Sequence, residues 1–154
     1  MKADDQFHLG IVTTDFDATV AALTATLGYE WGIRMTNPVD VELPTGPRQV
    51  ELTCQFSIQQ PRLEIVSSVA GTLWEPVPGG GIHHLGYWAD DVAADVAELT
   101  RNGWEVEATR PMPGTDPADG VLFFAFLSSA RGFRIELVDR RVEPGMRQCW
   151  AAVV

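Results

Sequence analysis

Two stretches of the chain, FHLGIVTTDFDATV at residues 7–20 and HHLGYWADDVAADV at residues 83–96, follow one pattern. Each places a histidine, a leucine and a glycine ahead of an aspartate, an alanine and a valine. Seven identical pairs stand in a single register, 76 residues apart: His8 and His84, Leu9 and Leu85, Gly10 and Gly86, Asp15 and Asp91, Ala18 and Ala94, Val20 and Val96, Leu23 and Leu99. The chain therefore contains one structural unit twice.

A second pair of segments supports the same duplication. PRLEIV from Pro61 and FRIELV from Phe133 share an arginine, a glutamate and a valine separated by apolar residues, at an offset of 72. Both halves of the chain thus carry the same elements in the same order.

Each half is predicted to form a strand, a helix and then further strands. In the first half the helix begins at Thr14 or Asp15 and ends at Gly28. In the second half it begins at Asp90 or Asp91 and ends at Gly103. The apolar positions of the helices recur at helical spacing: Phe16, Val20, Leu23 and Leu27 in the first, Val92, Val96 and Leu99 in the second. The later extended segments are 49–58, 62–66, 121–127 and 133–138.

The predicted organisation is one domain over residues 1–140, followed by a tail over 141–154. Within the domain, module one spans 6–70, a linker spans 71–81 and module two spans 82–140, because the run PVPGGG is typical of a connection. A chain of 154 residues that is 45% hydrophobic can bury a core of its own.

Composition also limits the partners. A formal net charge of −10 predicts no binding to nucleic acid or to anionic membranes and favours a small-molecule substrate. The N-terminus lacks a signal-peptide pattern and no apolar run reaches the length of a spanning helix, so we expect a cytoplasmic protein. Cys54 and Cys149 lack metal-site spacing and are expected to be buried or half-buried thiols.

Strand alternation predicts which side chains share a face. His8 lies on the same face as Gly10, and Glu64 lies on the same face as Arg62, while apolar neighbours point the other way. The equivalent face of the second half carries His84, Gly86 and Trp88 on one strand and Arg134 and Glu136 on another. A concave sheet would therefore gather both histidines and both glutamates on its polar side.

The adjacent histidines are expected to differ. His84 is in register with His8, whereas His83 corresponds to Phe7 and is predicted to face away from the polar side. Its imidazole would then reach a backbone carbonyl or solvent.

The four repeated residues His8, Glu64, His84 and Glu136 suit one divalent metal ion, such as Zn, Ni, Co, Mn or Fe. Four protein ligands in a six-coordinate site leave two positions for substrate oxygens. The alternative is a metal-free cleft that carries the same polar residues.

The chain resembles the vicinal oxygen chelate superfamily, the glyoxalase-like proteins, from Phe7 to Arg140. The resemblance lies in FHLGIVTTDFDATVAALTATLGYEW, PRLEIV, HHLGYWADDVAADVAELTRNGWEVEA and RIELVDR, and it is nearest to glyoxalase-like and methylmalonyl-CoA epimerase-like members. It implies an α+β fold in which two βαβββ modules form a cupped eight-stranded mixed sheet. The implied metal ligands are His8, Glu64, His84 and Glu136, and the implied catalytic base is Glu136 or Glu64.

One departure concerns the epimerases. They carry a glutamate base before the third strand of the first module, where this chain reads PTGPRQV, and Glu42 or Glu51 substitutes only if the alignment slips.

Three further residues and the tail carry expectations of their own. Arg62 and Arg134 are candidates to hold an anionic group of the substrate, or to form salt bridges at the rim of the cup. Trp88 is a candidate to line the substrate pocket or to pack in the core. The apolar end of the tail, after Arg140, predicts a homodimer in which the tail packs on the partner.

These observations together predict a metal-dependent glyoxalase-like isomerase, lyase or epimerase. It would transfer a proton through a metal-chelated enediolate of a small carbonyl or thioester substrate. The alternative is a non-catalytic protein that binds a small, antibiotic-like molecule in the same cup.

Overall fold

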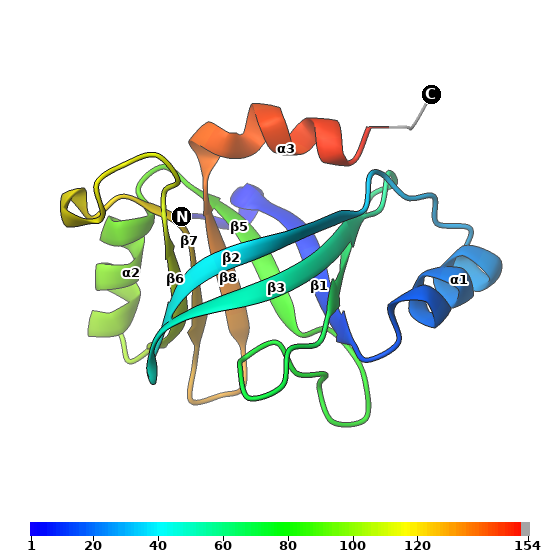
Figure 1. The fold of residues 1–154 in the computed structure, drawn as a ribbon, viewed down its shortest axis with the longest axis horizontal. Coiled ribbons are helices and arrows are strands. Elements are labelled where there is room, and N and C mark those ends of the chain that lie inside the picture. The colour runs from blue at the N-terminus through cyan, green and yellow to red at the C-terminus, as the bar shows by residue number, and fades with distance from the viewer. Residues whose placement is uncertain (152–154) are drawn as a thin grey trace.

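The computed structural model describes residues 1–151 as a closed, eight-stranded barrel with helices around it (Figure 1). The strands are β1 (Gln6–Thr13), β2 (Met35–Leu43), β3 (Gly46–Phe56), β4 (Leu63–Ser67), β5 (His84–Ala89), β6 (Glu105–Pro111), β7 (Leu122–Ser128) and β8 (Arg134–Asp139). The helices are α1 (Phe16–Leu27), α2 (Val92–Arg101) and α3 (Glu143–Cys149), with 3₁₀ turns at Ala3–Asp5, Pro117–Asp119 and Arg140–Val142. Among the described helices, none is long and apolar enough to cross a membrane.

The sheet topology confirms the predicted duplication. The strand order is β1-β4-β3-β2-β6-β7-β8-β5, so each half contributes four consecutive strands. β1 runs parallel to β4 and β5 runs parallel to β8, whereas β1 and β5 are antiparallel and join the two halves. On the other side β2 meets β6 at the pair Glu42 and Thr109, which closes the predicted cup into a barrel. The α+β class and the mixed sheet are confirmed.

The helix caps resolve the alternatives that the sequence left open. The Asp15 carboxylate accepts a hydrogen bond from the Ala18 amide at 3.1 Å, and Asp91 does the same for Ala94 at 3.0 Å. The two helices lie on opposite sides of the barrel (Figure 1). α1 has no fully buried residue and its Leu27 is 64% exposed, so its predicted apolar stripe is only partly covered.

Alternation along the strands separates two apolar layers. The inside of the barrel holds Val12, Val39, Val41, Val50, Val66, Trp74, Trp88, Ala108, Phe124, Phe126 and Val138. The layer beneath α2 holds Ala89, Val92, Ala125, Leu127, Ile135 and Leu137. In the second half, the apolar row therefore packs on the helix as alternation predicts.

Phe7 departs from the predicted alternation. The pairing of β1 with β5 is irregular between Gln6 and His8, and Phe7 stacks on Trp88 with ring centroids 3.7 Å apart. The irregularity turns Phe7 toward the inner apolar layer, against the expectation that it faces the opposite side from His8.

The tail lies on its own barrel through residue 151. α3 crosses one end of the barrel, opposite the linker (Figure 1). The Ile33 amide donates a hydrogen bond to the Cys149 carbonyl at 2.8 Å, and Trp150 contacts Phe56 with ring centroids 5.4 Å apart. These contacts place Cys149 and Trp150 against the barrel of the same chain, and the homodimer stays a prediction. The last three tail residues, 152–154, lie outside the described range.

Close packing between β1 and β5 depends on two glycines. In the antiparallel register His8 lies opposite Gly86, and Gly10 lies opposite His84. A Cβ built on Gly10 would lie 1.9 Å from Cε1 of His84, and one built on Gly86 would lie 1.9 Å from Cε1 of His8. Each imidazole thus occupies the space above a glycine of the other half.

We expect Gly86→Ala to lower the free energy of unfolding by about 2 kcal/mol, because the added methyl group must displace the buried ring of His8. Urea unfolding of the metal-free protein measures the change. Gly145→Ala in α3 is the matched control, since a Cβ there meets no atom of the described chain within 4 Å. Equal stability of the Gly86 variant and the wild type would contradict the close packing.

Candidate metal centre

Four side chains from four strands converge inside the barrel: His8, Glu64, His84 and Glu136. One nitrogen or oxygen of each lies within 4.8 Å of all the others. The two Nε2 atoms are 3.0 Å apart, Glu64 Oε2 is 3.2 Å from His84 Nε2, and Glu136 Oε2 is 3.2 Å from His8 Nε2. All four residues are buried, so the polar group is held away from bulk water.

The strand register brings the glutamates to the histidines. On the parallel pair β1 and β4, Glu64 lies beside Gly10, over which the ring of His84 sits. On the parallel pair β5 and β8, Glu136 lies beside Gly86 in the same way. Each half therefore places its own glutamate next to the histidine of the other half.

Electrostatic coupling within this group is strong in the metal-free protein. Burial opposes the charged form of His8, but hydrogen bonds and charges from Glu136 and Glu64 outweigh it and raise the pKa of His8 to about 9. Burial likewise disfavours the Glu64 carboxylate, yet His8 and His84 lower the pKa of Glu64 to about 2. The carboxylates create a site that attracts positive charge.

The donor set fits a divalent cation. The Nε2 atoms of both imidazoles point toward one position, and an oxygen of each carboxylate lies close to that position. Nitrogen and carboxylate oxygen are ligands for Zn, Ni, Co, Mn and Fe. The inward-facing nitrogens and oxygens of these four residues would therefore hold one such ion.

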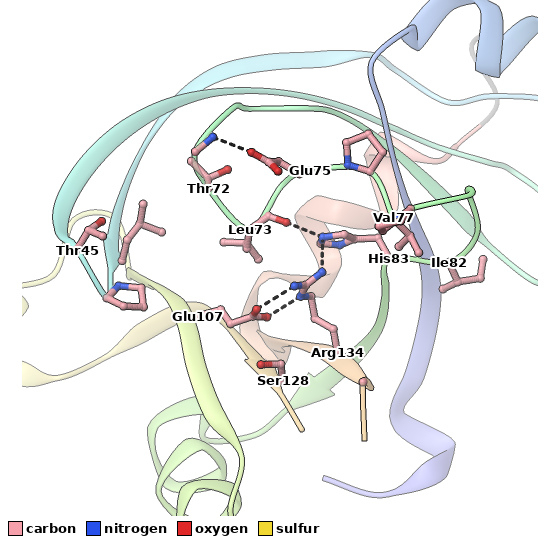
Figure 2. Close-up of a pocket in the computed structure, with 16 residues that line it drawn as sticks. Thr45, Thr72, Leu73, Glu75, Val77, Ile82, His83, Glu107, Ser128 and Arg134 are labelled. Carbon is pink, nitrogen blue, oxygen red and sulfur yellow. Dashed lines mark hydrogen bonds and ion pairs between the residues drawn. The ribbon is translucent and has the colours of Figure 1, made fainter. Parts of the chain in front are cut away.

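His83 lies outside this group, behind His84 and away from the converging atoms, but it contacts His84, which the sequence did not predict. His83 precedes β5, so strand alternation does not apply to it. Its Nδ1 lies 2.9 Å from Nδ1 of His84, and its Nε2 lies 2.7 Å from the Leu73 carbonyl oxygen, one of the two alternatives expected for it. His83 is buried, and Figure 2 shows its ring between the Leu73 carbonyl and Arg134.

Metal ligation by His84 would select one tautomer of the adjacent pair His83 and His84. Burial and the nearby His84 lower the pKa of His83 to about 4, so its ring is neutral. If His84 Nε2 offers its lone pair to a metal, Nδ1 of His84 carries the proton and donates it to Nδ1 of His83. His83 then donates from Nε2 to the Leu73 carbonyl. Nη1 of Arg134, which is also a donor and lies 2.7 Å from that Nε2, must turn away from it in this arrangement. In this tautomer His83 orients His84 as a ligand.

A cavity of about 490 Å³ extends from the two glutamates toward the end of the barrel that α3 covers. We call it the chamber. Its walls are mostly apolar and include Leu52, Phe124, Phe126 and Met146. The chamber can therefore hold a small organic molecule against the carboxylates.

Arg62, Arg134 and Trp88 lie outside the chamber. Arg62 donates a hydrogen bond to the Ser57 carbonyl at 2.6 Å and stacks on Trp150. Its guanidinium therefore contacts neither the chamber, where a substrate anion would lie, nor an acidic side chain of the described residues. Trp88 takes the core alternative and is 5% exposed.

Arg134 lies in a second cavity, of about 770 Å³, near the linker (Figure 2). There it forms a two-point salt bridge with Glu107, including an Nη2 to Oε1 distance of 2.8 Å. Its third contact is with Nε2 of His83, at 2.7 Å. The salt-bridge alternative for Arg134 is therefore the one observed.

Two chamber residues have no role in the sequence prediction. Arg110 enters the chamber from β6. Its position two residues after Ala108, on the same face of the strand, is the one sequence feature that could have predicted this. Cys54 enters it from β3 as a half-buried thiol, as expected, and burial together with Glu64 and Glu136 raises its pKa. Glu42 and Glu51 are exposed on the outside of the barrel, so neither supplies a further carboxylate to the chamber.

Comparison with known proteins agrees with this architecture. The sequence matches the profile of the Glyoxalase/Bleomycin resistance protein/Dioxygenase superfamily over residues 7–126. No curated protein matches the chain.

Several solved structures are similar. A methylmalonyl-CoA epimerase in complex with methylmalonyl-CoA and NH4+ is 24% identical, with a TM-score of 0.58 and coverage of 88% of this chain and 93% of that one. A hypothetical protein from Bacillus halodurans C-125 is 22% identical, with a TM-score of 0.53 and the same coverages. The methylmalonyl-CoA epimerase of Mycobacterium tuberculosis is 16% identical, with a TM-score of 0.53 and coverages of 88% and 87%. At these identities the likeness concerns the fold.

We expect His83→Ala to weaken Co²⁺ binding about 10- to 100-fold, as is typical when the hydrogen-bond partner of a ligating histidine is lost. Titration of the metal-free variants measures the affinity. His83→Asn is the matched variant, because its amide oxygen can accept the proton from His84 and should retain most of the affinity. Unchanged affinity in His83→Ala would show that His83 does not orient His84.

We also expect Co²⁺ affinity to rise with pH. The pKa of His8 is raised to about 9 in the metal-free protein, so below that pH an entering ion must displace a proton. Apparent affinity should increase about tenfold per pH unit between pH 7 and 9 and level off above. Glu64, with its pKa lowered to about 2, does not compete in this range. Competition titrations against a chelator test this, and a flat profile would contradict it.

Proposed function

The chain belongs to the glyoxalase/bleomycin resistance protein/dioxygenase superfamily, and from this membership we propose that it is a metal-dependent isomerase, lyase or epimerase. Its substrate would be a small carbonyl or thioester compound from which a proton is removed beside the carbonyl group. The observation that carries the proposal is the convergence of two histidines and two glutamates at the inner end of a mostly apolar chamber.

Each residue of the site has a proposed role. His8, Glu64, His84 and Glu136 would hold one divalent ion, which as a Lewis acid supplies stabilisation of negative charge on substrate oxygen. Glu136 and Glu64 are the residues of this group that line the chamber, so either carboxylate can accept a proton from a substrate carbon and return it. His83 keeps His84 in the ligating tautomer, and the apolar walls exclude water.

The proposal concerns a reaction class rather than methylmalonyl-CoA. Two of the similar structures are epimerases of that name, but their likeness to this chain concerns the fold. Glu42 and Glu51, the residues that a shifted alignment would offer as the epimerase base, point away from the chamber. The proton transfer proposed here depends on the two central glutamates alone.

A binding protein is the second candidate function. Its support is the chamber itself, which is walled by aromatic and aliphatic side chains and covered by α3. Such a chamber can retain an apolar molecule without chemistry. The difference between the two functions lies in whether carbon-bound protons of a ligand exchange.

Proton exchange in D₂O tests the proposal. We expect the Zn²⁺- or Co²⁺-loaded protein to exchange the proton beside the carbonyl in at least one class among α-hydroxy ketones, hemithioacetals and 2-substituted thioesters, as followed by ¹H NMR. Chelation should abolish the exchange, and Glu136→Gln or Glu64→Gln at saturating metal should slow it about 100-fold or more, as is typical for loss of a general base.

The two glutamine variants also identify the base, because the residue that accepts the proton should show the larger loss of rate. Arg101→Gln, on the exposed end of α2, serves as the control and should exchange as the wild type does. A ligand that binds in the chamber without exchange above the chelated protein would favour the binding function instead.

A further inference from the structure

Arg110 is a positively charged side chain directed into the chamber. It lies on β6, two residues after the buried Ala108, and pairs with Phe124 on β7. Strand alternation therefore turns it inward, and it lines the same cavity as Glu64 and Glu136. An arginine in this position faces the space that a substrate would occupy.

The guanidinium of Arg110 stacks on an aromatic ring, and the charge of Asp40 acts on it without a direct ion pair. Its central carbon lies 4.7 Å from the centroid of the Phe123 ring. Within residues 1–151 it forms no hydrogen bond or ion pair. Asp40, an acid of the neighbouring strand β2, is exposed and accepts a hydrogen bond from Gln49 at 2.8 Å. The N–H groups at the edge of the guanidinium remain available to a ligand.

Four other arginines bind groups of the protein itself. Arg134, Arg140 and Arg141 each form a salt bridge with a carboxylate, and Arg62 donates to backbone carbonyls. None of these four lines the chamber. Arg110 is thus the arginine that combines a place in the chamber with donors that have no partner in the described chain.

We propose that Arg110 binds an anionic oxygen group of the substrate, a carboxylate or a phosphate, while the carbonyl end of the same molecule lies against the glutamates. This inference rests on the proposed function and extends it to the substrate class. A guanidinium matches the geometry of carboxylate and phosphate through two parallel hydrogen bonds. The substrate would have a carbonyl or thioester at one end, an apolar middle part along Phe124 and Phe126, and an anion at the other end.

The charge of the protein gives such a group a clear use with an anionic substrate. The chain carries a formal charge of −10, and two carboxylates lie at the inner end of the chamber. The net charge of the chain repels an entering anion, while a divalent ion at the centre would balance the charge of the two carboxylates. Arg110 offsets this repulsion and fixes the direction in which the molecule enters.

Hydroxamates provide a probe that needs no knowledge of the substrate, because they chelate metals as a bidentate carbonyl compound would. We would titrate the Co²⁺-loaded protein with a series of hydroxamates of increasing chain length, each ending in a carboxylate, a phosphonate or a neutral amide. The Co²⁺ absorption spectrum reports chelation, and calorimetry gives the affinity. At the chain length that fits, the wild type should bind one of the two anionic forms about 10- to 100-fold more tightly than the neutral amide.

Arg110→Gln should remove this preference and leave binding of the neutral amide unchanged, which also shows that the variant is folded and metal-loaded. Arg101→Gln should keep the preference. The form that binds more tightly, carboxylate or phosphonate, identifies the anion. Equal binding of anionic and neutral probes by the wild type, or an unchanged preference in Arg110→Gln, would overturn the inference while leaving the proposed function intact. Failure of every hydroxamate to perturb the Co²⁺ spectrum would count against the proposed function, and the inference about Arg110 would fail with it.

Discussion

The structure depends on one steric constraint, the packing of each central histidine over a glycine of the other half. His8 lies opposite Gly86 and His84 lies opposite Gly10, and no side chain larger than hydrogen fits beneath either ring. This register brings the two Nε2 atoms to 3.0 Å from each other. A shift of one residue between β1 and β5 would place the two histidines on opposite faces of the sheet, because side chains alternate along a strand. The repeated His-x-Gly pattern is therefore a requirement of the fold as well as of the site.

Much of the fold could be predicted because it follows from local rules. The repeat, with an offset of 76 residues for the histidines and 72 for the glutamates, together with strand alternation grouped His8, His84, Glu64 and Glu136 on one face, since duplicated strands present duplicated faces. The aspartate caps of both helices follow from hydrogen bonding to the first helical turn, which depends only on nearby residues.

The remainder depends on where side chains bind outside the regular strand pattern. His83 lies outside β5, so alternation could not place it, and its partner Leu73 comes from the linker. Arg62 and Arg134 have long side chains whose heads reach beyond their own strand, to the Ser57 carbonyl and to Glu107 respectively. Alternation determines where such a side chain starts and leaves open where its charged end binds.

The segments that are not repeated make the two halves of the centre unequal. On one side, the linker supplies the Leu73 carbonyl to His83 and so fixes the ring of His84, whereas Nδ1 of His8 is buried without a hydrogen-bond partner in residues 1–151. The two imidazoles therefore differ as donors, although the strands that carry them are related by the repeat. On the other side, α3 covers the end of the barrel toward which the chamber extends from Glu64 and Glu136. A molecule in the chamber therefore contacts the two carboxylates and not the histidines. The repeated strands supply the metal-binding atoms, whereas the linker and the tail determine from which side a substrate reaches them.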